Sequence, residues 1–236
     1  MTEPTITPSP NIWHWPDVYE IENRAQDVTG RLWAAVRERC DWAGRDVVDV
    51  GCGDGFHLAR FAESARSVIG VEPHPPLVER ARARVAGLPG VDVRQAPAQR
   101  LPLADASADL VHARTAYFFG PGCEPGLREA ERVLRPGGAL VIVDLDTACP
   151  PYGEWMRADA PNLDPLAIEA FFERQGFAST GVRALWRFAD RAKLAAVLEI
   201  EFSPKVAHRA LAQITGCALE VGYRVRVRRR PSGLLR

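Results

Sequence analysis

A cluster of three glycines is the part of this sequence best suited to chemistry. Gly51, Gly53 and Gly55 follow the apolar run 46–50 and precede a segment of helical periodicity. Because glycine has no side chain, such a loop lets the backbone approach a ligand closely. Open α/β sheets bind ligands at the carboxyl ends of their strands, where this loop falls. We therefore expect a small ligand to lie on the loop.

An acidic residue ends the next strand-like run. Glu72 stands 21 residues after Gly51, where a carboxylate accepts hydrogen bonds from ribose hydroxyls in nucleotide-binding folds. Phe56 occupies the place of the third glycine of a dinucleotide fingerprint, and no Walker Gly-Lys-Ser/Thr follows. Asp49 and Asp54 flank the loop with negative charge, which suits an ammonium or sulfonium centre better than a pyrophosphate. The pattern predicts a cationic nucleoside as ligand.

Four segments together resemble the class I S-adenosylmethionine-dependent methyltransferases, in the branch that methylates small molecules. They are VVDVGCGDG at 47–55, VIGVEP at 68–73, QRLPLADASADLVHA at 99–113 and REAERVLRPGGALVI at 128–142. The resemblance covers about residues 46–145. It implies transfer of a methyl group from S-adenosylmethionine to an O, N or C atom of a small molecule, leaving S-adenosylhomocysteine.

The resemblance also implies which residues hold the cofactor. Asp49, Gly51 and Gly53 should line its methionine moiety. Glu72 should hold the ribose hydroxyls, and Pro73 should lie near adenine.

The adenine contact departs from the family pattern. Family members often carry Asp-Ala shortly before the Leu-Pro pair, whereas this chain has Pro97-Ala98. We expect the backbone of Ala98 or the side chain of Gln99 to meet adenine instead. Cys52 and Ala113 complete the expected cofactor site, with Cys52 as a small filler of the loop.

Residues at the end of the fourth predicted strand should face the same pocket. His112 fits two roles, a catalytic base that titrates near neutrality or a hydrogen-bonded residue of the rim. Arg114 is suited to pair with a substrate carboxylate or the cofactor, or with an acid such as Asp144. Tyr117, Phe118 and Phe119 form either a wall of the substrate site or plain core.

A second group of aromatic residues lies near the N-terminus. Trp13, His14, Trp15 and Tyr19 present more apolar area than a free tail would expose. We expect them to form a lid over the pocket, with packing on the domain's side or a dimer contact as alternatives. Trp13 and Tyr19 are then substrate-binding candidates, and His14 is a second candidate base.

The sequence contains candidate ligands for a metal, but we do not expect a metal site. Asp144 and Asp146 end the fifth predicted strand and could join His112 around a divalent cation. An Asp-x-Asp pair at a strand end serves equally well as a loop anchor. We therefore predict no metal.

The elements that must position these residues alternate along the chain. An N-terminal tail and one lid helix over about 20–39 should make up residues 1–40, ahead of a single methyltransferase domain at 41–236. Alternation of strands and helices predicts an α/β, Rossmann-like, doubly wound and mostly parallel seven-stranded sheet. Expected strands are 46–50, 67–71, 91–94, 108–113, 139–145 and 178–188, and expected helices are 54–65, 75–86, 125–135, 165–175 and 190–214.

The last predicted strand, 219–229, alternates apolar residues with arginines. Arg224, Arg226 and Arg228 recur at every second position, so they should share one solvated face, with contacts to RNA phosphates as the alternative. We expect this strand to be antiparallel.

The composition limits the classes of partner that this protein is expected to bind. The 236 residues hold 30 basic and 30 acidic side chains, so no overall field attracts nucleic acid or an anionic membrane. The five cysteines form no C-x-x-C pair, which indicates a reducing compartment. We expect a cytoplasmic protein whose partner is a small-molecule acceptor. The alternatives are a catalytically silent cofactor-binding regulator and a nicotinamide-dependent oxidoreductase.

Overall fold

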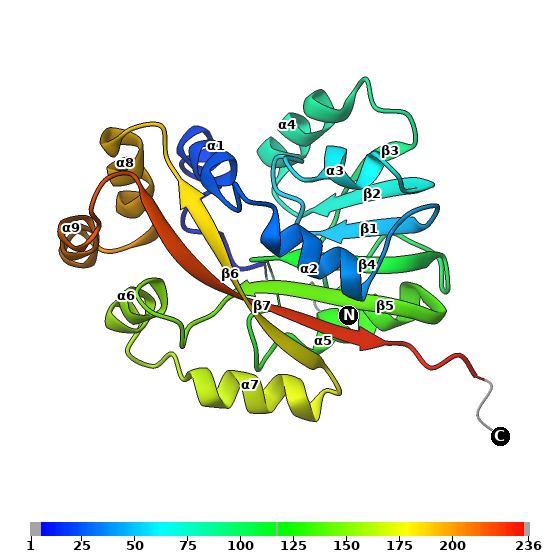
Figure 1. The fold of residues 1–236 in the computed structure, drawn as a ribbon. Helices are drawn as coiled ribbons and strands as arrows, with labels where there is room; N and C mark the ends of the chain where they lie inside the picture. Colours follow the sequence, from blue (N-terminus) through cyan, green and yellow to red (C-terminus); the bar gives the residue numbers. More distant parts are fainter. Residues whose placement is uncertain (1–5, 117, 234–236) are drawn as a thin grey trace.

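A mixed seven-stranded sheet forms the centre of the molecule (Figure 1). The structure is a computed structural model that describes residues 6–116 and 118–233. The strands lie in the order β3-β2-β1-β4-β5-β7-β6. Their bounds are β1 (Asp46–Val50), β2 (Ser67–Glu72), β3 (Val91–Gln95), β4 (Ala108–Arg114), β5 (Leu134–Leu145), β6 (Ala178–Arg187) and β7 (Ala218–Arg229).

The predicted fold class is confirmed. Strands β1 to β5 pair in parallel, and β7 runs antiparallel to both of its neighbours, β5 and β6. The helices are α1 (Pro16–Ala25), α2 (Arg31–Arg39), α3 (Leu58–Ala62), α4 (Pro75–Val85), α5 (Glu124–Val133), α6 (Tyr152–Asp159), α7 (Pro165–Arg174), α8 (Arg191–Glu201) and α9 (Pro204–Gln213). No helix within the described residues is both long and apolar enough to cross a membrane.

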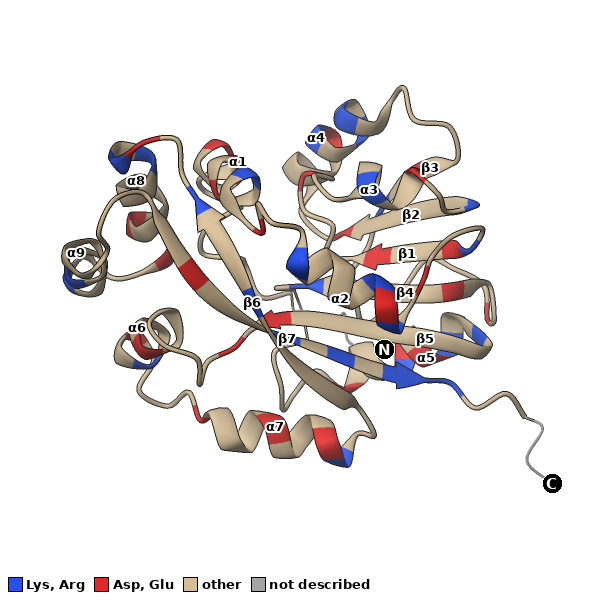
Figure 2. Cartoon of the chain, viewed as in Figure 1, with Lys and Arg blue, Asp and Glu red and all other residues tan. Residues whose placement is uncertain are grey.

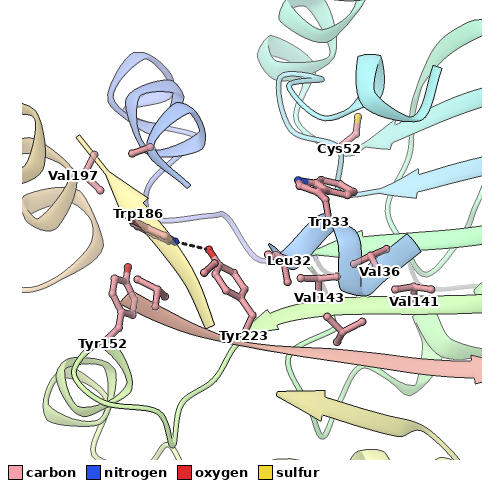
Figure 3. Packing of buried hydrophobic residues seen from close by; sticks show 14 of the residues in the cluster. Leu32, Trp33, Val36, Cys52, Val141, Val143, Tyr152, Trp186, Val197 and Tyr223 are labelled. Atoms are coloured by element: carbon pink, nitrogen blue, oxygen red, sulfur yellow. Dashed lines mark hydrogen bonds between the residues drawn. The ribbon is translucent and has the colours of Figure 1, made fainter. Parts of the chain in front are cut away.

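Apolar side chains cover both faces of the sheet. On one face Leu32 and Val36 of α2 lie beside Val141 and Val143 of β5, while Trp33 points towards Cys52 (Figure 3). On the other face α5 and α7 cover the alternate strand positions. Because side chains alternate along a strand, neighbouring residues of β4 and β5 point to opposite layers. This alternation decides which polar residues can meet.

The N-terminal lid helix is two helices, and the prediction of one was wrong. The chain turns between α1 and α2 at Asp27, a residue with a φ of 47°. Its carboxylate accepts hydrogen bonds from the N–H groups of Leu32 and Trp33 at 3.0 to 3.1 Å. It thereby satisfies free donors at the start of α2. Leu185 of β6 also accepts a hydrogen bond from the N–H of Val28.

Two other helix predictions need correction. The stretch 190–214 divides into α8 and α9 at Pro204, which has no N–H to continue a helix and is suited to begin one. The helix after the glycine loop begins at Leu58 rather than at residue 54, because Gly55 has a φ of 81° outside the helical range. Helix α6 was not predicted.

The arginines of β7 do not form a solvated face, and that prediction was wrong. β7 lies inside the sheet, between β5 and β6, and α7 covers the side on which these arginines lie. Arg226 is only 2% exposed; it donates to Asp144 at 2.9 Å and also contacts Glu169. Arg224 pairs with Asp146 at 3.1 Å. Figure 2 shows the basic half of β7.

Candidate functional site

A cavity of about 580 Å³ lies at the carboxyl ends of the parallel strands. The volume falls within the range of pockets that hold drug-sized ligands. Its walls come from the glycine loop, the ends of β2 to β5, the N-terminal segment 6–13, α1, and residues of α6, α7 and α8. A smaller cavity of about 230 Å³ adjoins it beside α3 and shares Gln26, His57 and Arg114.

The glycine loop forms one wall as predicted. Gly51 has a φ of 74°, and its N–H donates to the carbonyl of Val71 at 2.7 Å. A Cβ atom at Gly51 would lie 2.5 Å from the Cβ of Ala116, and one at Gly53 would lie 2.9 Å from Ile12. Only glycine leaves room here, and the loop therefore presents backbone to the cavity. Cys52 also lines it.

Glu72 ties this loop to the end of β2. Its carboxylate accepts hydrogen bonds from the N–H of Gly53 at 3.1 Å and the N–H of His74 at 3.0 Å. Burial raises the pKa of Glu72 to about 7, although both N–H groups act in the opposite direction. Glu72 and Pro73 line the cavity, and so do Ala98 and Gln99 from the connection after β3.

Asp49 and His112 do not line the cavity, and the prediction that they do was wrong. They face each other on β1 and β4, with Asp49 Oδ1 2.7 Å from His112 Nδ1. The imidazole is fully buried between Trp33 and Phe61, with ring centroids 5.7 and 5.0 Å away. Side-chain alternation sends both residues under α2 rather than past the strand ends. His112 cannot reach an acceptor in the cavity.

Two apolar candidates for the site, Ala113 and Phe118, do not line the cavity. Ala113 and Phe118 are each 1% exposed and belong to the core between the sheet, α5 and α7. Phe118 is therefore core rather than a substrate wall. Phe119, beside it, lines the cavity and is 58% exposed. Tyr117 lies outside the described residues.

The N-terminal segment folds over the cavity instead of remaining a loose tail. Trp13 stacks on His74, with ring centroids 4.1 Å apart, and both Trp13 and Tyr19 line the cavity. His14 and Trp15 are exposed and do not line it, so His14 is not placed to act as a base.

Arg114 reaches the cavity from the end of β4, as predicted. Its guanidinium donates to Gln26, the residue that follows α1, and not to Asp144. It also lies over the rings of Trp33 and Tyr223, 5.6 and 5.4 Å from their centroids. The following residue, Thr115, has a φ of 42°, a conformation that β-branched residues rarely adopt.

The wall opposite the glycine loop holds two carboxylates that the sequence did not suggest as site residues. Glu22 of α1 and Glu201 of α8 both line the cavity. Glu201 accepts hydrogen bonds from Asn11 and from the Tyr152 hydroxyl, the latter at 3.3 Å. A signal was present: Glu22 precedes Ala25 by three residues, on the apolar stripe of its helix. Glu201 follows Leu198 in the same way.

His57 also lines the cavity. Burial holds its pKa well below the ordinary value for histidine, so the imidazole is neutral. The proposed metal ligands Asp144 and His112 are separated, because they point to opposite faces of the sheet.

These residues fit an adenosyl sulfonium cofactor. Gly51 and Gly53 present backbone to the cavity where a side chain would clash with Ala116 or Ile12, and Glu72 offers a buried carboxylate for hydroxyl donors. Such a cofactor would rest on Gly51 and Gly53, with its ribose at Glu72 and its base near Pro73, Ala98 and Gln99.

Known proteins with similar sequences include methyltransferases, which use such a cofactor. Residues 48–142 match the sequence model of a family described as methyltransferase domain. A probable S-adenosylmethionine-dependent methyltransferase of Mycolicibacterium smegmatis is 37% identical over 111 residues, 47% of this chain and 41% of that protein. The ubiquinone/menaquinone biosynthesis C-methyltransferase UbiE of Rubrivivax gelatinosus is 30% identical over 169 residues, 63% of this chain and 66% of that protein.

A solved structure shares the fold. The YcgJ protein of Bacillus subtilis matches with a TM-score of 0.61 and 16% identity, over 85% of this chain and 98% of that chain. Against the first curated relatives the match is shorter, and the chain spans 31 to 49% of their length.

Proposed function

This chain belongs to the class I S-adenosylmethionine-dependent methyltransferases, and we propose that it transfers a methyl group from that cofactor to a small-molecule acceptor. One observation carries the proposal. The glycine loop after β1 and the carboxylate that ends β2 are hydrogen-bonded to each other and line one cavity. The remaining volume of the cavity, beyond the strand ends, is where an acceptor would bind.

The chain's own contribution is positioning. The bound cofactor supplies an electrophilic methyl group on a sulfonium sulfur. Methyl transfer needs the acceptor atom aligned at near-attack distance, which can lower the barrier without acid–base chemistry. The loop glycines and Glu72 hold the cofactor in this proposal, and the walls from α1, α6 and α8 hold the acceptor.

We propose that the N-terminal segment excludes water from the cavity. Trp13 on His74, Ile12 beside Gly53 and Asn11 on Glu201 tie this segment to both sides of the cavity. A water-free cavity strengthens electrostatic interactions within it. In this proposal residues 6–26, within the N-terminal unit predicted at 1–40, cover the domain at 41–236.

The atom that receives the methyl group is an O, N or C atom of the acceptor. The relative from Rubrivivax gelatinosus is named a C-methyltransferase, which favours carbon. The carboxylate-lined wall favours an acceptor with hydrogen-bond donors.

Ligand-induced stabilisation tests the cofactor assignment first. S-adenosylhomocysteine at a hundredfold excess over its Kd should stabilise the protein by about 2.7 kcal/mol. That raises the Tm of a chain this size by roughly 5 to 10 °C. NADH should leave the Tm unchanged. Stabilisation by NADH alone would instead identify a nicotinamide-dependent oxidoreductase.

Turnover is tested next with methyl-labelled S-adenosylmethionine and a panel of small amines, phenols and quinols. A labelled acceptor confirms the proposed activity. Stabilisation by S-adenosylhomocysteine without any labelled product would favour a catalytically silent cofactor-binding protein.

A further inference from the structure

Two carboxyl groups, those of Glu22 and Glu201, line the cavity at α1 and α8. Glu22 is 3% exposed, and Gln26 donates a hydrogen bond to its Oε1 at 2.7 Å. Its other oxygen, Oε2, is buried and has no donor within the described part of the chain. The Glu201 carboxyl lines the same cavity, and its charge acts on Glu22. A hydrogen-bond donor bound in the cavity could satisfy the Oε2 atom, because an ionised carboxylate only accepts.

Burial and charge repulsion oppose ionisation of the two carboxyl groups. Burial and the Glu201 charge raise the pKa of Glu22, and burial raises the pKa of Glu201. A cation bound between like-charged carboxylates relieves this repulsion. Arg114 is the cation that faces Glu22, but it reaches that residue only through the Gln26 amide. The remaining titratable groups near the pair are the hydroxyls of Tyr19, Tyr152 and Tyr223.

The cavity as a whole is acidic. Two arginines, Arg114 and Arg226, line it together with a larger number of acidic residues. Arg226 is already paired with Asp144 and Glu169. The acids are Glu22, Asp54, Glu72, Asp144 and Glu201.

We propose that Glu22 and Glu201 bind the acceptor through an ammonium group, which donates a hydrogen bond to Oε2 of Glu22. This inference rests on the proposed function and names its acceptor class as cationic amines. Tyr19, Phe119, Met156, Leu163 and Ile168 line the same cavity and supply apolar surface for the rest of the acceptor.

The position of the pair favours the acceptor over the cofactor as its ligand. Both glutamates lie outside residues 48–142, the segment that matches the family. They come from α1 and α8, while the cofactor features lie on the loops after β1, β2 and β3. A group that selects one acceptor among many belongs outside the shared segment, because function varies on a common fold through its added parts.

A matched set of probes tests this. We would measure binding of 2-phenylethylamine, 2-phenylethanol and 3-phenylpropanoate to the full chain saturated with S-adenosylhomocysteine, using ligand-observed NMR at pH 7.5. The phenyl ring suits the apolar wall, and the three probes differ in charge. The amine should bind at least tenfold more tightly than the propanoate. Equal binding of amine and propanoate would overturn the proposal, and tighter binding of the alcohol would show that the pair selects a neutral donor instead.

Variants assign the preference to the pair. Glu22→Gln and Glu201→Gln should each reduce the amine preference to about threefold or less, while Glu199→Gln, on the exposed side of the same helix as Glu201, should leave it unchanged. Both substitutions keep the side-chain size and remove a buried charge, so the fold should persist. The Kd for S-adenosylhomocysteine, measured by calorimetry, should stay within about twofold.

The same measurements separate the two proposals. If Glu22→Gln weakens S-adenosylhomocysteine rather than the amine, the pair holds the cofactor and the inference is wrong. If the wild-type chain fails to bind S-adenosylhomocysteine at all, the proposed function falls. The amine preference, measured then on the free protein, would still decide for or against the glutamate pair.

Discussion

Asp49 and His112 form a buried hydrogen-bonded pair across β1 and β4, with Asp49 Oδ1 2.7 Å from His112 Nδ1. Both residues lie beneath the cavity rather than in it. The pair fixes the end of β1, two residues before Gly51. Its role is thus to support the glycine loop.

His112→Ala should therefore destabilise the fold without removing a catalytic group. The change leaves a void beside Trp33 and an unpaired buried Asp49, at a cost of about 2–4 kcal/mol in the free energy of unfolding. Urea denaturation measures this cost. His208→Ala, at an exposed position of α9, is the control and should change stability by less than about 0.5 kcal/mol. A stable variant that binds cofactor but has lost methyl transfer would restore His112 as a base.

Gly51→Ala should abolish cofactor binding even though alanine is small. The added Cβ would lie 2.5 Å from the Cβ of Ala116, and the φ of 74° is unfavourable for alanine. We expect a loss of about 1–3 kcal/mol in stability and a Kd for S-adenosylhomocysteine at least a hundredfold higher by calorimetry. Gly87→Ala, where a Cβ meets no atom within 4 Å, is the matched control. An unchanged Kd for Gly51→Ala would contradict the placement of the cofactor on the loop.

Glu72→Gln should change the pH dependence of stability. The pKa of Glu72 is about 7 in the folded protein against 4.5 when exposed, so the folded state binds the proton more tightly. Wild-type stability then falls as pH rises from about 4.5 to 7, by about 3 kcal/mol at most. The variant lacks this loss, so its stability relative to wild type should improve from pH 5 to pH 8. Thermal unfolding at both pH values measures the difference, and parallel profiles would contradict the raised pKa.

The same carboxylate should govern cofactor affinity in the opposite direction. Only the ionised form of Glu72 accepts two hydroxyl hydrogen bonds, so wild-type affinity for S-adenosylhomocysteine should increase from pH 6 to pH 8. Glu72→Gln should weaken binding at pH 8 by about 1–3 kcal/mol and show a flatter profile. Calorimetry at pH 6, 7 and 8 provides the comparison. Equal affinities of the two proteins at pH 8 would exclude Glu72 from the ribose site.

Arg226→Ala should be far more damaging than Arg229→Ala. Removing Arg226 leaves the buried Asp144 without its partner, at a cost of about 3–5 kcal/mol. Arg229 is exposed, and its loss should cost about 0.5 kcal/mol or less. Because the Arg226 pair is shielded from solvent, its contribution should depend little on salt. Similar small effects for both variants would mean that the arginines of β7 form a solvated face after all.

The local sequence pattern predicted most strands of the sheet, and it predicted that the glycine loop and Glu72 line one cavity. Glycine spacing after β1 and the acid that ends β2 depend on backbone conformation and strand position, which neighbouring residues determine. Phe118 and Phe119 show the limit of this reasoning. They are adjacent and chemically identical, yet one is core and the other lines the cavity.

The sequence by itself therefore determined the family, the succession of strands along the chain, and the loop on which the cofactor is proposed to rest. Only the tertiary structure decided that His112 faces Asp49 under α2, that Arg226 is buried, and that Glu22 and Glu201, 179 positions apart in the chain, line one cavity. The physical reason is that a pattern specifies which side chains share one face of an element. Which faces meet, and which buried charges then find a partner, depends on how distant elements pack.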